Sequence, residues 1–164
     1  MNQYKTAHLT LKNLGETAKF GLLLGKLARP GDVICLDGDL GAGKTTLTQS
    51  IAKGLGVAAE PPVTSPSFAI FQEYQGRIPL YHFDLYRLHG PDDVLALGLE
   101  EYFSLAGCAV IEWSGRAEDI LPENHLRLEL RVAAGEARDV FCRYHEEGWA
   151  ARWRSLTQEL SIFE

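Results

Sequence analysis

The 164-residue sequence has few cysteines and no long apolar run. Its three cysteines, Cys35, Cys108 and Cys142, form no closely spaced pair, and each lies in an apolar stretch. We therefore expect buried, reduced thiols rather than disulfides. The N-terminus lacks the basic and apolar pattern of a targeting segment, and no stretch approaches the roughly 18 apolar residues of a membrane span. These absences predict a cytoplasmic protein that is not associated with a membrane.

Basic charge is also scarce. Lys and Arg number 16 against 22 Asp and Glu, which gives a formal net charge of −6. Because a protein that binds many phosphates of a nucleic acid usually presents a net basic face, this balance disfavours direct nucleic-acid binding. The length fits one domain of roughly 150 residues, and 46% hydrophobic residues exclude a disordered chain. We expect a single domain over residues 1–164.

The hydrophobic pattern predicts strands and helices that alternate along much of the chain. Strands are expected at residues 7–11, 33–37, 68–74, 78–84, 108–113, 125–132 and 138–144. The strands 68–74 and 78–84 are expected to form one hairpin, which adds antiparallel character to the sheet, and 125–132 and 138–144 a second. Helices are expected at 14–28, at 44–55, from Pro91 to about Gly98, and at the C-terminus, where Trp149, Trp153, Leu156, Leu160 and Phe163 recur at helical spacing. Asn13 stands three residues before Glu16, a variant capping box for the first helix. Residues 114–122 are expected to form a loop.

The strongest motif is the segment 38–45, Gly-Asp-Leu-Gly-Ala-Gly-Lys-Thr, which matches G-x-x-x-x-G-K-[ST] between a predicted strand and a predicted helix. In such a loop, glycines let the backbone turn tightly and direct its N–H groups at phosphates. The lysine reaches the β and γ phosphates, and the hydroxyl binds Mg²⁺. Gly38, Gly43, Lys44 and Thr45 occupy these positions. The sequence therefore predicts an α/β fold of the three-layer P-loop NTPase type, with a mainly parallel sheet flanked by helices.

Two carboxylates stand at the ends of apolar strands. Asp84 ends the strand that contains Leu80–Phe83, and Glu112 ends a second strand that begins at Cys108. The carboxyl ends of parallel strands gather on one sheet edge, where ligands bind. We predict that Asp84 binds Mg²⁺ and that Glu112 either meets Mg²⁺ or polarises the attacking water. A turn cap for Asp84 and an ion pair for Glu112 are the structural alternatives.

Other polar residues give weaker signals. The segment 64–67, Thr-Ser-Pro-Ser, follows the predicted helix where nucleotide switches place a hydroxyl that senses the γ-phosphate. His82 and His89 are expected to pack or hydrogen-bond rather than to catalyse. The Arg- and Trp-rich segment 143–154 could stack RNA bases, but a helix that buries its tryptophans and exposes its arginines explains it better. Because the sequence has no N-K-x-D segment for guanine, adenine is the favoured base.

Four segments together resemble the TsaE (YjeE) family of small bacterial ATPases. They are GDLGAGKTT at 38–46, TSPSF at 64–68, YHFDLYRL at 81–88 and IEW at 111–113. Their order and separations match over about residues 10–145. The family is needed, with TsaB, TsaC and TsaD, to make threonylcarbamoyladenosine at position 37 of tRNAs that read codons beginning with A. The resemblance implies Mg²⁺-dependent, slow hydrolysis of ATP to ADP, docking on the TsaB–TsaD complex, and only indirect contact with tRNA.

The resemblance also assigns roles to individual residues. It implies that Trp113 lines the site and that Arg138 approaches the nucleotide. The implied nucleotide-binding residues are Gly38, Asp39, Leu40, Gly41, Ala42, Gly43, Lys44, Thr45, Thr46, Trp113 and Arg138. The implied metal ligands are Thr45, Asp84 and Glu112, and the implied catalytic residues are Lys44, Asp84 and Glu112. The family usually reads Ser-Pro-Thr where residues 65–67 read Ser-Pro-Ser, which retains a hydroxyl.

Two other functions stay open. A small-molecule kinase would use the same loop, but it needs an acceptor pocket and usually a lid that carries arginines. Only Arg87 and Arg116 are placed to contribute to such a lid. A nucleotide-sensing module would regulate a partner through its ATP-bound state rather than through turnover. Hydrolysis with and without partner proteins separates the sensing module from the ATPase, and phosphate transfer to a metabolite would establish the kinase.

Overall fold

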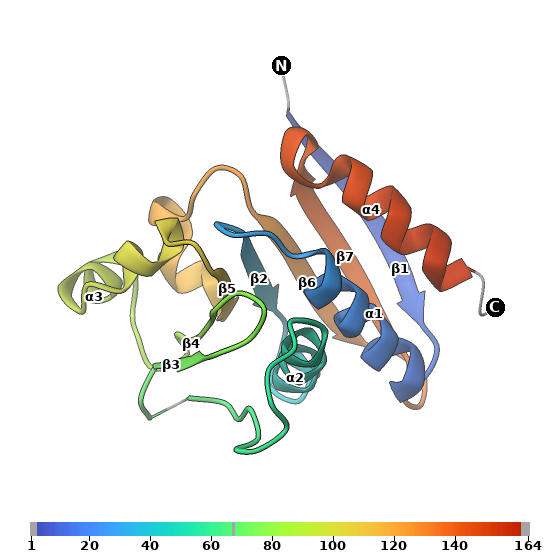
Figure 1. Cartoon of the computed structure of the whole chain (residues 1–164), viewed down its shortest axis with the longest axis horizontal. Helices are drawn as coiled ribbons and strands as arrows, with labels where there is room; N and C mark the ends of the chain where they lie inside the picture. The colour runs from blue at the N-terminus through green and yellow to red at the C-terminus, as the bar shows by residue number, and fades with distance from the viewer. Residues whose placement is uncertain (1–2, 67, 162–164) are drawn as a thin grey trace.

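The computed structural model describes residues 3–66 and 68–161, which form a seven-stranded sheet with the order β1-β7-β6-β2-β5-β4-β3 (Figure 1). The strands are β1 (Tyr4–Leu11), β2 (Val33–Asp37), β3 (Phe71–Tyr74), β4 (Leu80–Asp84), β5 (Cys108–Glu112), β6 (Leu126–Val132) and β7 (Arg138–His145). The helices are α1 (Leu14–Leu27), α2 (Lys44–Gly54), α3 (Pro91–Ala96) and α4 (Glu146–Ser161), with 3₁₀ helices η1 (Leu99–Ser104) and η2 (Ser114–Ile120). None of these described helices is long and apolar enough to cross a bilayer.

Most predicted elements are present, with shifted bounds in some and two unpredicted 3₁₀ helices. Strand β1 begins at Tyr4 rather than at residue 7, β4 begins at Leu80 rather than at residue 78, and η1 was not predicted. The strand expected at 68–74 begins only at Phe71. The segment 114–122, expected to be a loop, contains the 3₁₀ helix Ser114–Ile120. Short 3₁₀ turns are held by i to i+3 hydrogen bonds and span too few residues to produce an amphipathic pattern, so no periodic signal predicts this one.

The sheet is mixed rather than mainly parallel, which corrects our expectation. Strand β2 runs parallel to β5 and β6, and β4 runs parallel to β5. The pairs β3–β4, β6–β7 and β1–β7 are antiparallel. A short connection such as residues 133–137 can only return the chain antiparallel, whereas a parallel neighbour needs a long crossover. The parallel strands therefore form the centre, and the antiparallel strands extend the sheet at both sides.

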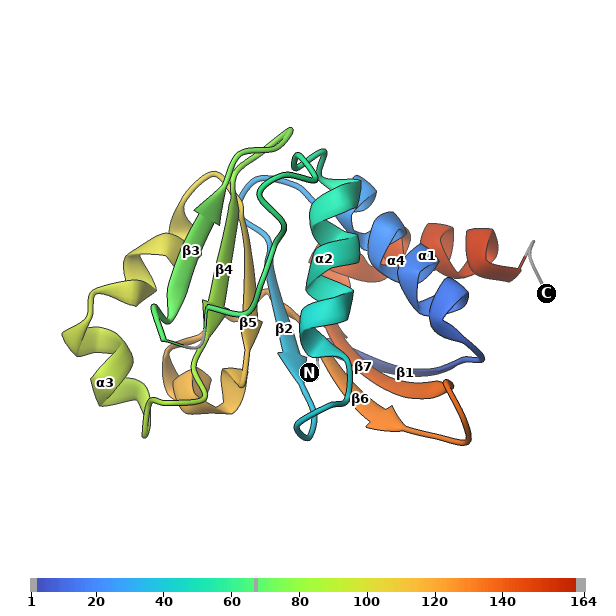
Figure 2. The same ribbon diagram turned by 90° about the horizontal axis from the view of Figure 1, so that it is seen from below.

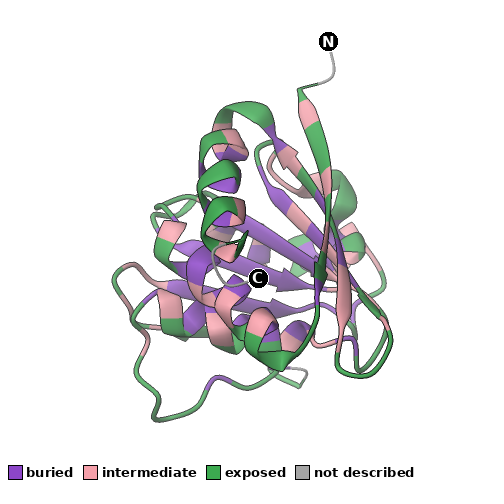
Figure 3. Cartoon of the chain, turned by 90° about the vertical axis from the view of Figure 1, so that its right-hand side faces the viewer, coloured by how far each residue is buried: buried purple, intermediate pink, exposed green. Residues whose placement is uncertain are grey.

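Helices cover both faces of the sheet. Figure 2 shows α1, α2 and α4 on one face of the twisted sheet and α3 on the other, beside β3, β4 and β5. One core joins α1, α2 and α4 to the sheet through residues such as Phe20, Leu47 and Trp149. The second core, with Phe83 and Phe103, lies under α3 and the 3₁₀ helices. The sheet is thus covered by helices on both faces and is buried at its centre (Figure 3).

Helix α1 fixes the position of α2, the helix that follows the glycine-rich loop. Asn13 caps α1, since its Oδ1 accepts a hydrogen bond from the Glu16 N–H at 2.9 Å, as the capping box predicted. Where the two helices cross, a Cβ on Gly25 would lie 2.1 Å from the carbonyl oxygen of Ile51. Only glycine permits this close packing of the two backbones.

The C-terminal helix α4 buries its tryptophans as expected, but one arginine is buried with them. Trp149 and Trp153 pack into the core, and Arg152 is only 5% exposed. Its guanidinium donates to both oxygens of Asp32, at 2.5 and 3.0 Å, and lies over the Trp149 ring. This corrects the expectation that α4 exposes its arginines, because a paired guanidinium can be buried where a single charge could not. Phe163 lies outside the described residues.

Candidate functional site

The site is built on the backbone between β2 and α2, which we call the glycine loop (residues 38–45). Gly38, Gly41 and Gly43 have φ angles of 144°, 82° and 106°, in a region that side-chain-bearing residues rarely adopt. A Cβ on Gly38 would also lie 2.5 Å from the Leu130 carbonyl oxygen on β6. The loop therefore needs these glycines to turn from the strand into the helix. It ends at the N-terminus of α2, where the first N–H groups and the helix dipole favour an anion.

Lys44 is the first residue of α2, and its side chain folds back onto the start of the glycine loop. Its Nζ donates to the carbonyl oxygens of Gly38 at 2.6 Å and Asp39 at 2.9 Å, and it lies 4.4 Å from the centre of the Trp113 ring. Burial lowers the pKa of Lys44, and the nearby carboxylates of Glu112 and Asp84 oppose that shift. The ammonium group is thus held by carbonyl dipoles and an aromatic face at the floor of the loop.

Thr45 and Glu112 are joined by a direct hydrogen bond. The Thr45 hydroxyl lies 3.0 Å from Oε1 of Glu112 and 3.3 Å from Oε2. Glu112 is 3% exposed at the end of β5, and its Oε2 lies 2.5 Å from Nε2 of His82 on β4. The parallel pairing of β2 with β5 brings the end of β5 beside the start of the loop. A buried carboxylate thus faces the hydroxyl that the motif singles out.

Asp84 occupies the corresponding position on the next strand. Its Oδ2 accepts a hydrogen bond from the Ser65 hydroxyl at 2.6 Å, and its Oδ1 accepts one from the Tyr86 N–H at 3.0 Å. These bonds connect the segment 64–66, which precedes β3, to the end of β4. Ser67, part of the same predicted segment, lies outside the described residues. Among the described residues of that segment, Ser65 provides the hydroxyl that contacts Asp84.

Trp113 has an unusual backbone conformation beside the loop. Its φ and ψ are 60° and 45°, in the left-handed region, which costs roughly 1–2 kcal/mol for a residue with a side chain. The conformation is held on both sides. The Trp113 N–H donates to the Leu36 carbonyl at 3.1 Å, and Ser114 donates to Asp37 through its N–H at 2.8 Å and its hydroxyl at 2.6 Å. The ring is thereby directed over Lys44.

Two adjoining cavities open beside Trp113. The first, about 270 Å³, is lined by Leu40, Gly41, Gly43, Lys44, Thr45, Thr46, Ser65, Asp84, Glu112 and Trp113. The second, about 300 Å³, is lined by Asp37, Gly38, Asp39, Trp113, Gly115, Arg116 and Glu129. Ala42, within the glycine loop, is buried. The Nε of Arg138 donates a hydrogen bond to the carbonyl oxygen of Ala42 at 2.8 Å. The fold thus brings predicted residues from four separate segments to these cavities, whereas Ala42 and Arg138 line neither cavity.

Sequence reasoning assigned no site role to three residues at this edge. Asp37 orients the turn after β5, Tyr86 packs its ring 4.9 Å from that of Trp113, and His82 contacts Glu112. One signal was available for His82. It stands two residues before Asp84 on the same strand, and alternate residues of a strand share a face.

The donor set suits a small, hard cation. Thr45, Asp84 and Glu112 offer hydroxyl and carboxylate oxygens, the ligands that Mg²⁺ prefers. Across residues 3–66 and 68–161, no cluster of three or more His, Cys, Asp or Glu side chains is arranged to hold a metal by itself. Mg²⁺ usually binds through one or two carboxylates together with the phosphates of a substrate.

The structure is therefore that of a mixed α/β protein. Its sheet carries the glycine loop and two carboxylates together at the carboxyl ends of neighbouring strands. The model of the family described as "Threonylcarbamoyl adenosine biosynthesis protein TsaE" matches residues 11–140. The chain belongs to the TsaE family and is involved in the biosynthesis of threonylcarbamoyladenosine in tRNA.

Individual relatives are similar over most of their length. The chain is 43% identical over 129 residues to the TsaE protein of Bacillus subtilis, covering 78% of this chain and 79% of that protein. It is 39% identical over 148 residues to the TsaE protein of Streptomyces coelicolor, covering 88% and 97%. The crystal structure of Bacillus subtilis YdiB superposes with a TM-score of 0.78 at 32% identity, covering 97% of this chain and 99% of that one. The mixed sheet with its flanking helices therefore has an experimental counterpart.

Proposed function

We propose that this chain is a P-loop NTPase that binds ATP with Mg²⁺ at the glycine loop and hydrolyses it slowly in support of tRNA threonylcarbamoylation. The observation that carries the proposal is the hydrogen bond from Thr45 to the buried Glu112, with Asp84 on the adjoining strand. These groups converge at the N-terminus of α2. Such an arrangement of hydroxyl, lysine and strand-end carboxylates is what phosphoryl chemistry requires beside a phosphate.

Each residue has a distinct task in this proposal. The N–H groups of residues 41–46 bind the phosphates, and Lys44 exchanges its loop carbonyls for the β and γ phosphate oxygens. Thr45, Asp84 and Glu112 would hold Mg²⁺, which when bound neutralises charge on the phosphates. Glu112 also orients the attacking water.

Trp113 closes one wall of the site, and Arg138 keeps the loop in place through Ala42. Asp39 and Leu40 belong to the loop backbone that binds the nucleotide.

Adenine is the base we propose, because the chain has no N-K-x-D segment to recognise guanine. The cavity beyond Trp113 adjoins the phosphate site and is large enough to take part of a nucleoside. Calorimetry with ATP, ADP and GTP, each with and without Mg²⁺, tests this directly. We expect ATP and ADP to bind and GTP to bind much more weakly. Equal affinity for GTP would refute the assignment of the base.

We propose the TsaB–TsaD complex as the protein partner, with tRNA contacted only through it. The acidic charge of the chain supports this division, since tRNA would be held by the other components. The decisive experiment adds this chain and ATP to purified TsaB, TsaC, TsaD and tRNA. We expect repeated rounds of modification only when the chain and hydrolysable ATP are both present. Full modification without the chain would exclude the role.

The small-molecule kinase is the weaker alternative. One of its two candidate lid arginines, Arg87, has its guanidinium 4.1 Å from the centre of the Phe68 ring. The other, Arg116, lines the second cavity, beyond Trp113 from the carboxylates. Release of inorganic phosphate from ATP in the absence of a metabolite supports the ATPase, and phosphate transfer to a metabolite would establish the kinase.

A further inference from the structure

His82 lies in the middle of β4 and has no surface exposure. It shares its face of the strand with Asp84, and its Nε2 lies 2.5 Å from Oε2 of Glu112 on the neighbouring strand. The cavity beside the glycine loop is lined by Glu112 but not by His82. His82 therefore reaches that cavity only through the carboxylate that it contacts.

The contact determines how the Glu112 carboxylate is oriented. The final torsion of a glutamate side chain is broad and roughly two-fold, so one hydrogen bond leaves the two oxygens free to exchange places. Thr45 has a single hydroxyl hydrogen, and its oxygen is nearer to Oε1 than to Oε2. The imidazole N–H on Oε2 provides the second fixed point. With both contacts made, Oε1 stays toward the glycine loop and Oε2 toward the interior.

The other nitrogen of the ring supports this reading. Nδ1 of His82 is buried, and no described residue offers it a hydrogen-bond partner. Buried polar groups are normally satisfied, and an apolar side chain would fill the same space without an unpaired nitrogen. A purely structural role does not account for a histidine at this position. The contact with Glu112 is what an apolar side chain could not provide.

We propose that His82 is a positioning residue that holds the Glu112 carboxylate in the orientation needed to bind Mg²⁺ and to orient water. The proposal rests on the function proposed above, because it assigns His82 a role in that same site. His82 touches neither nucleotide nor metal in this proposal. It acts by keeping one carboxylate oxygen occupied, so that the other is presented to the site.

Three variants test the proposal. His82→Leu removes the N–H donor, whereas His82→Gln keeps an amide N–H at a comparable reach. Val110→Ala is the matched packing control, since Val110 is the fully buried register partner of His82 on β5. For each variant we would measure ATP turnover, the affinity for ADP without Mg²⁺, and the Mg²⁺ concentration that gives half-maximal thermal stabilisation of the ADP complex. The last two measurements do not depend on catalysis.

We expect His82→Leu to lower turnover by about tenfold or more and to raise the Mg²⁺ midpoint several-fold, while the Mg²⁺-free affinity for ADP changes by less than about threefold. His82→Gln should retain turnover and the Mg²⁺ midpoint within about threefold. Val110→Ala should lower the melting temperature but leave the Mg²⁺ midpoint unchanged. In a Glu112→Gln background, His82→Leu should shift the Mg²⁺ midpoint no further, because the group it positions is gone.

Two results would overturn the positioning role. One is a His82→Leu variant with the turnover and Mg²⁺ midpoint of the wild type. The other is a loss in His82→Gln or Val110→Ala as large as that in His82→Leu, which would show that the site responds to packing alone. Failure of the underlying function is distinguishable, because the wild-type chain itself would then show no ATP turnover and no Mg²⁺-dependent stabilisation by ADP.

Discussion

Asp84 and Glu112 are register partners at the last paired position of the parallel strands β4 and β5. Although they lie side by side, they have different partners. Asp84 binds the Ser65 hydroxyl of the segment before β3, whereas Glu112 binds Thr45 of the glycine loop and His82 of β4. One carboxylate thus connects the site to an exposed segment, and the other connects it to the interior. A ligand that binds both carboxylates would couple the segment around Ser65 to the glycine loop.

Lys44→Ala should weaken nucleotide binding while leaving the fold intact. Hydrogen bonds from a charged donor contribute about 1.5–3 kcal/mol, so the dissociation constant for ATP should rise roughly 10- to 100-fold. Calorimetry with Mg²⁺ and ATP measures the change. Lys53→Ala, an exposed lysine on the same helix, is the control and should bind normally. Unchanged affinity in Lys44→Ala would refute the phosphate-binding assignment of the glycine loop.

Glu112→Gln and Asp84→Asn should each keep ATP binding and lose most turnover, on the order of 100-fold. Each change preserves the shape of the side chain but removes the negative charge that holds Mg²⁺ or orients water. Phosphate release under saturating ATP is the measurement. Asp119→Asn, an exposed carboxylate on η2, should have no effect. A variant at Asp84 or Glu112 with full turnover would show that its carboxylate is structural.

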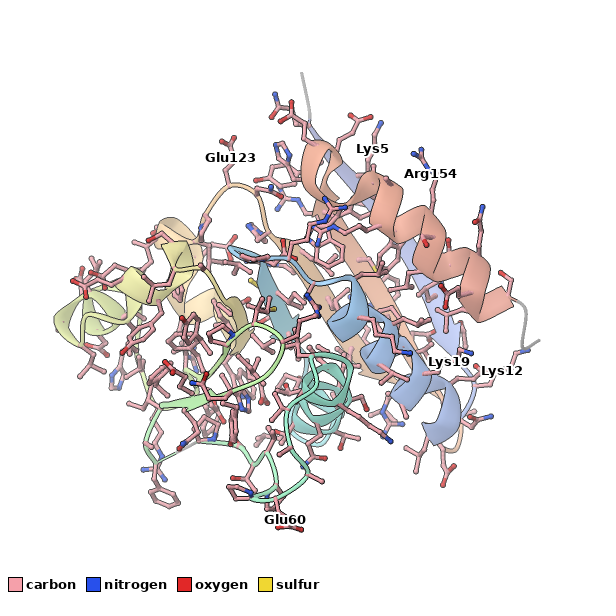
Figure 4. All side chains as sticks on the ribbon, viewed as in Figure 1. Lys5, Lys12, Lys19, Glu60, Glu123 and Arg154 are labelled. Carbon is pink, nitrogen blue, oxygen red and sulfur yellow. The ribbon has the colours of Figure 1, made fainter. Side chains whose placement is uncertain are left out.

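The chain alone should bind tRNA weakly or not at all and associate with it only when TsaB–TsaD is present. The segment 143–154 was the sequence feature that could have provided an RNA surface. Its Trp149, Arg152 and Trp153 are buried, whereas Arg154 extends outward from α4 (Figure 4). Titration of labelled tRNA at 50 and 200 mM salt decides the matter. A protein that makes even six phosphate contacts should lose about a thousandfold in affinity for tRNA over that range. Tight, steeply salt-dependent binding by the chain alone would contradict the prediction.

Arg152→Ala should destabilise the protein by about 3–5 kcal/mol, because it leaves Asp32 partly buried without its partner. The guanidinium also donates to the Leu27 carbonyl at 3.1 Å and so joins α4 to the end of α1. Urea unfolding provides the free energy of unfolding. Arg154→Ala, two residues away and exposed, should change that free energy by less than about 0.5 kcal/mol. Equal stability of the two variants would show that the buried ion pair contributes little.

Stability should fall as the pH drops below about 6.5, and His125 should contribute to the fall. Burial lowers the pKa of His125 from its ordinary value of 6.5, with a smaller opposing effect from its hydrogen bond to the Pro122 carbonyl. Below that value the unfolded chain binds a proton at this histidine before the folded chain does. Protonation therefore favours unfolding until the lowered folded pKa is reached.

Replacing His125 by Gln removes this proton uptake. The free energy of unfolding, measured by urea denaturation between pH 7.5 and pH 5, should then depend less steeply on pH than in the wild type. Asn124→Ala is the control and should leave the slope unaltered, because Asn124 is the exposed neighbour of His125 and has no ionisable group. An unchanged slope in His125→Gln would show that this histidine does not contribute.

The sequence by itself determined most of the local elements and the side chains that are available at the candidate site. The glycine loop was predictable because its glycines, lysine and threonine must stand at fixed spacing in one short segment. The strands ending in Asp84 and Glu112 and the Asn13 cap were predictable for the same reason, since each depends on neighbouring residues. The hairpins β3–β4 and β6–β7 were predictable too, because a short connection joins the two strands of each. The order of the strands and the pairing of β1 with β7 were not, and the sheet proved mixed rather than mainly parallel.

Only the tertiary structure decided which groups touch. His82 and Glu112 are 30 positions apart, Thr45 and Glu112 are 67 apart, and Asp32 and Arg152 are 120 apart. Hydrophobic period and motif spacing describe positions along the chain, whereas these contacts depend on strand order, register and burial. The burial of Arg152 and the position of His82 behind Glu112 both follow from which strand or helix packs beside which, and that is settled only when the whole core forms.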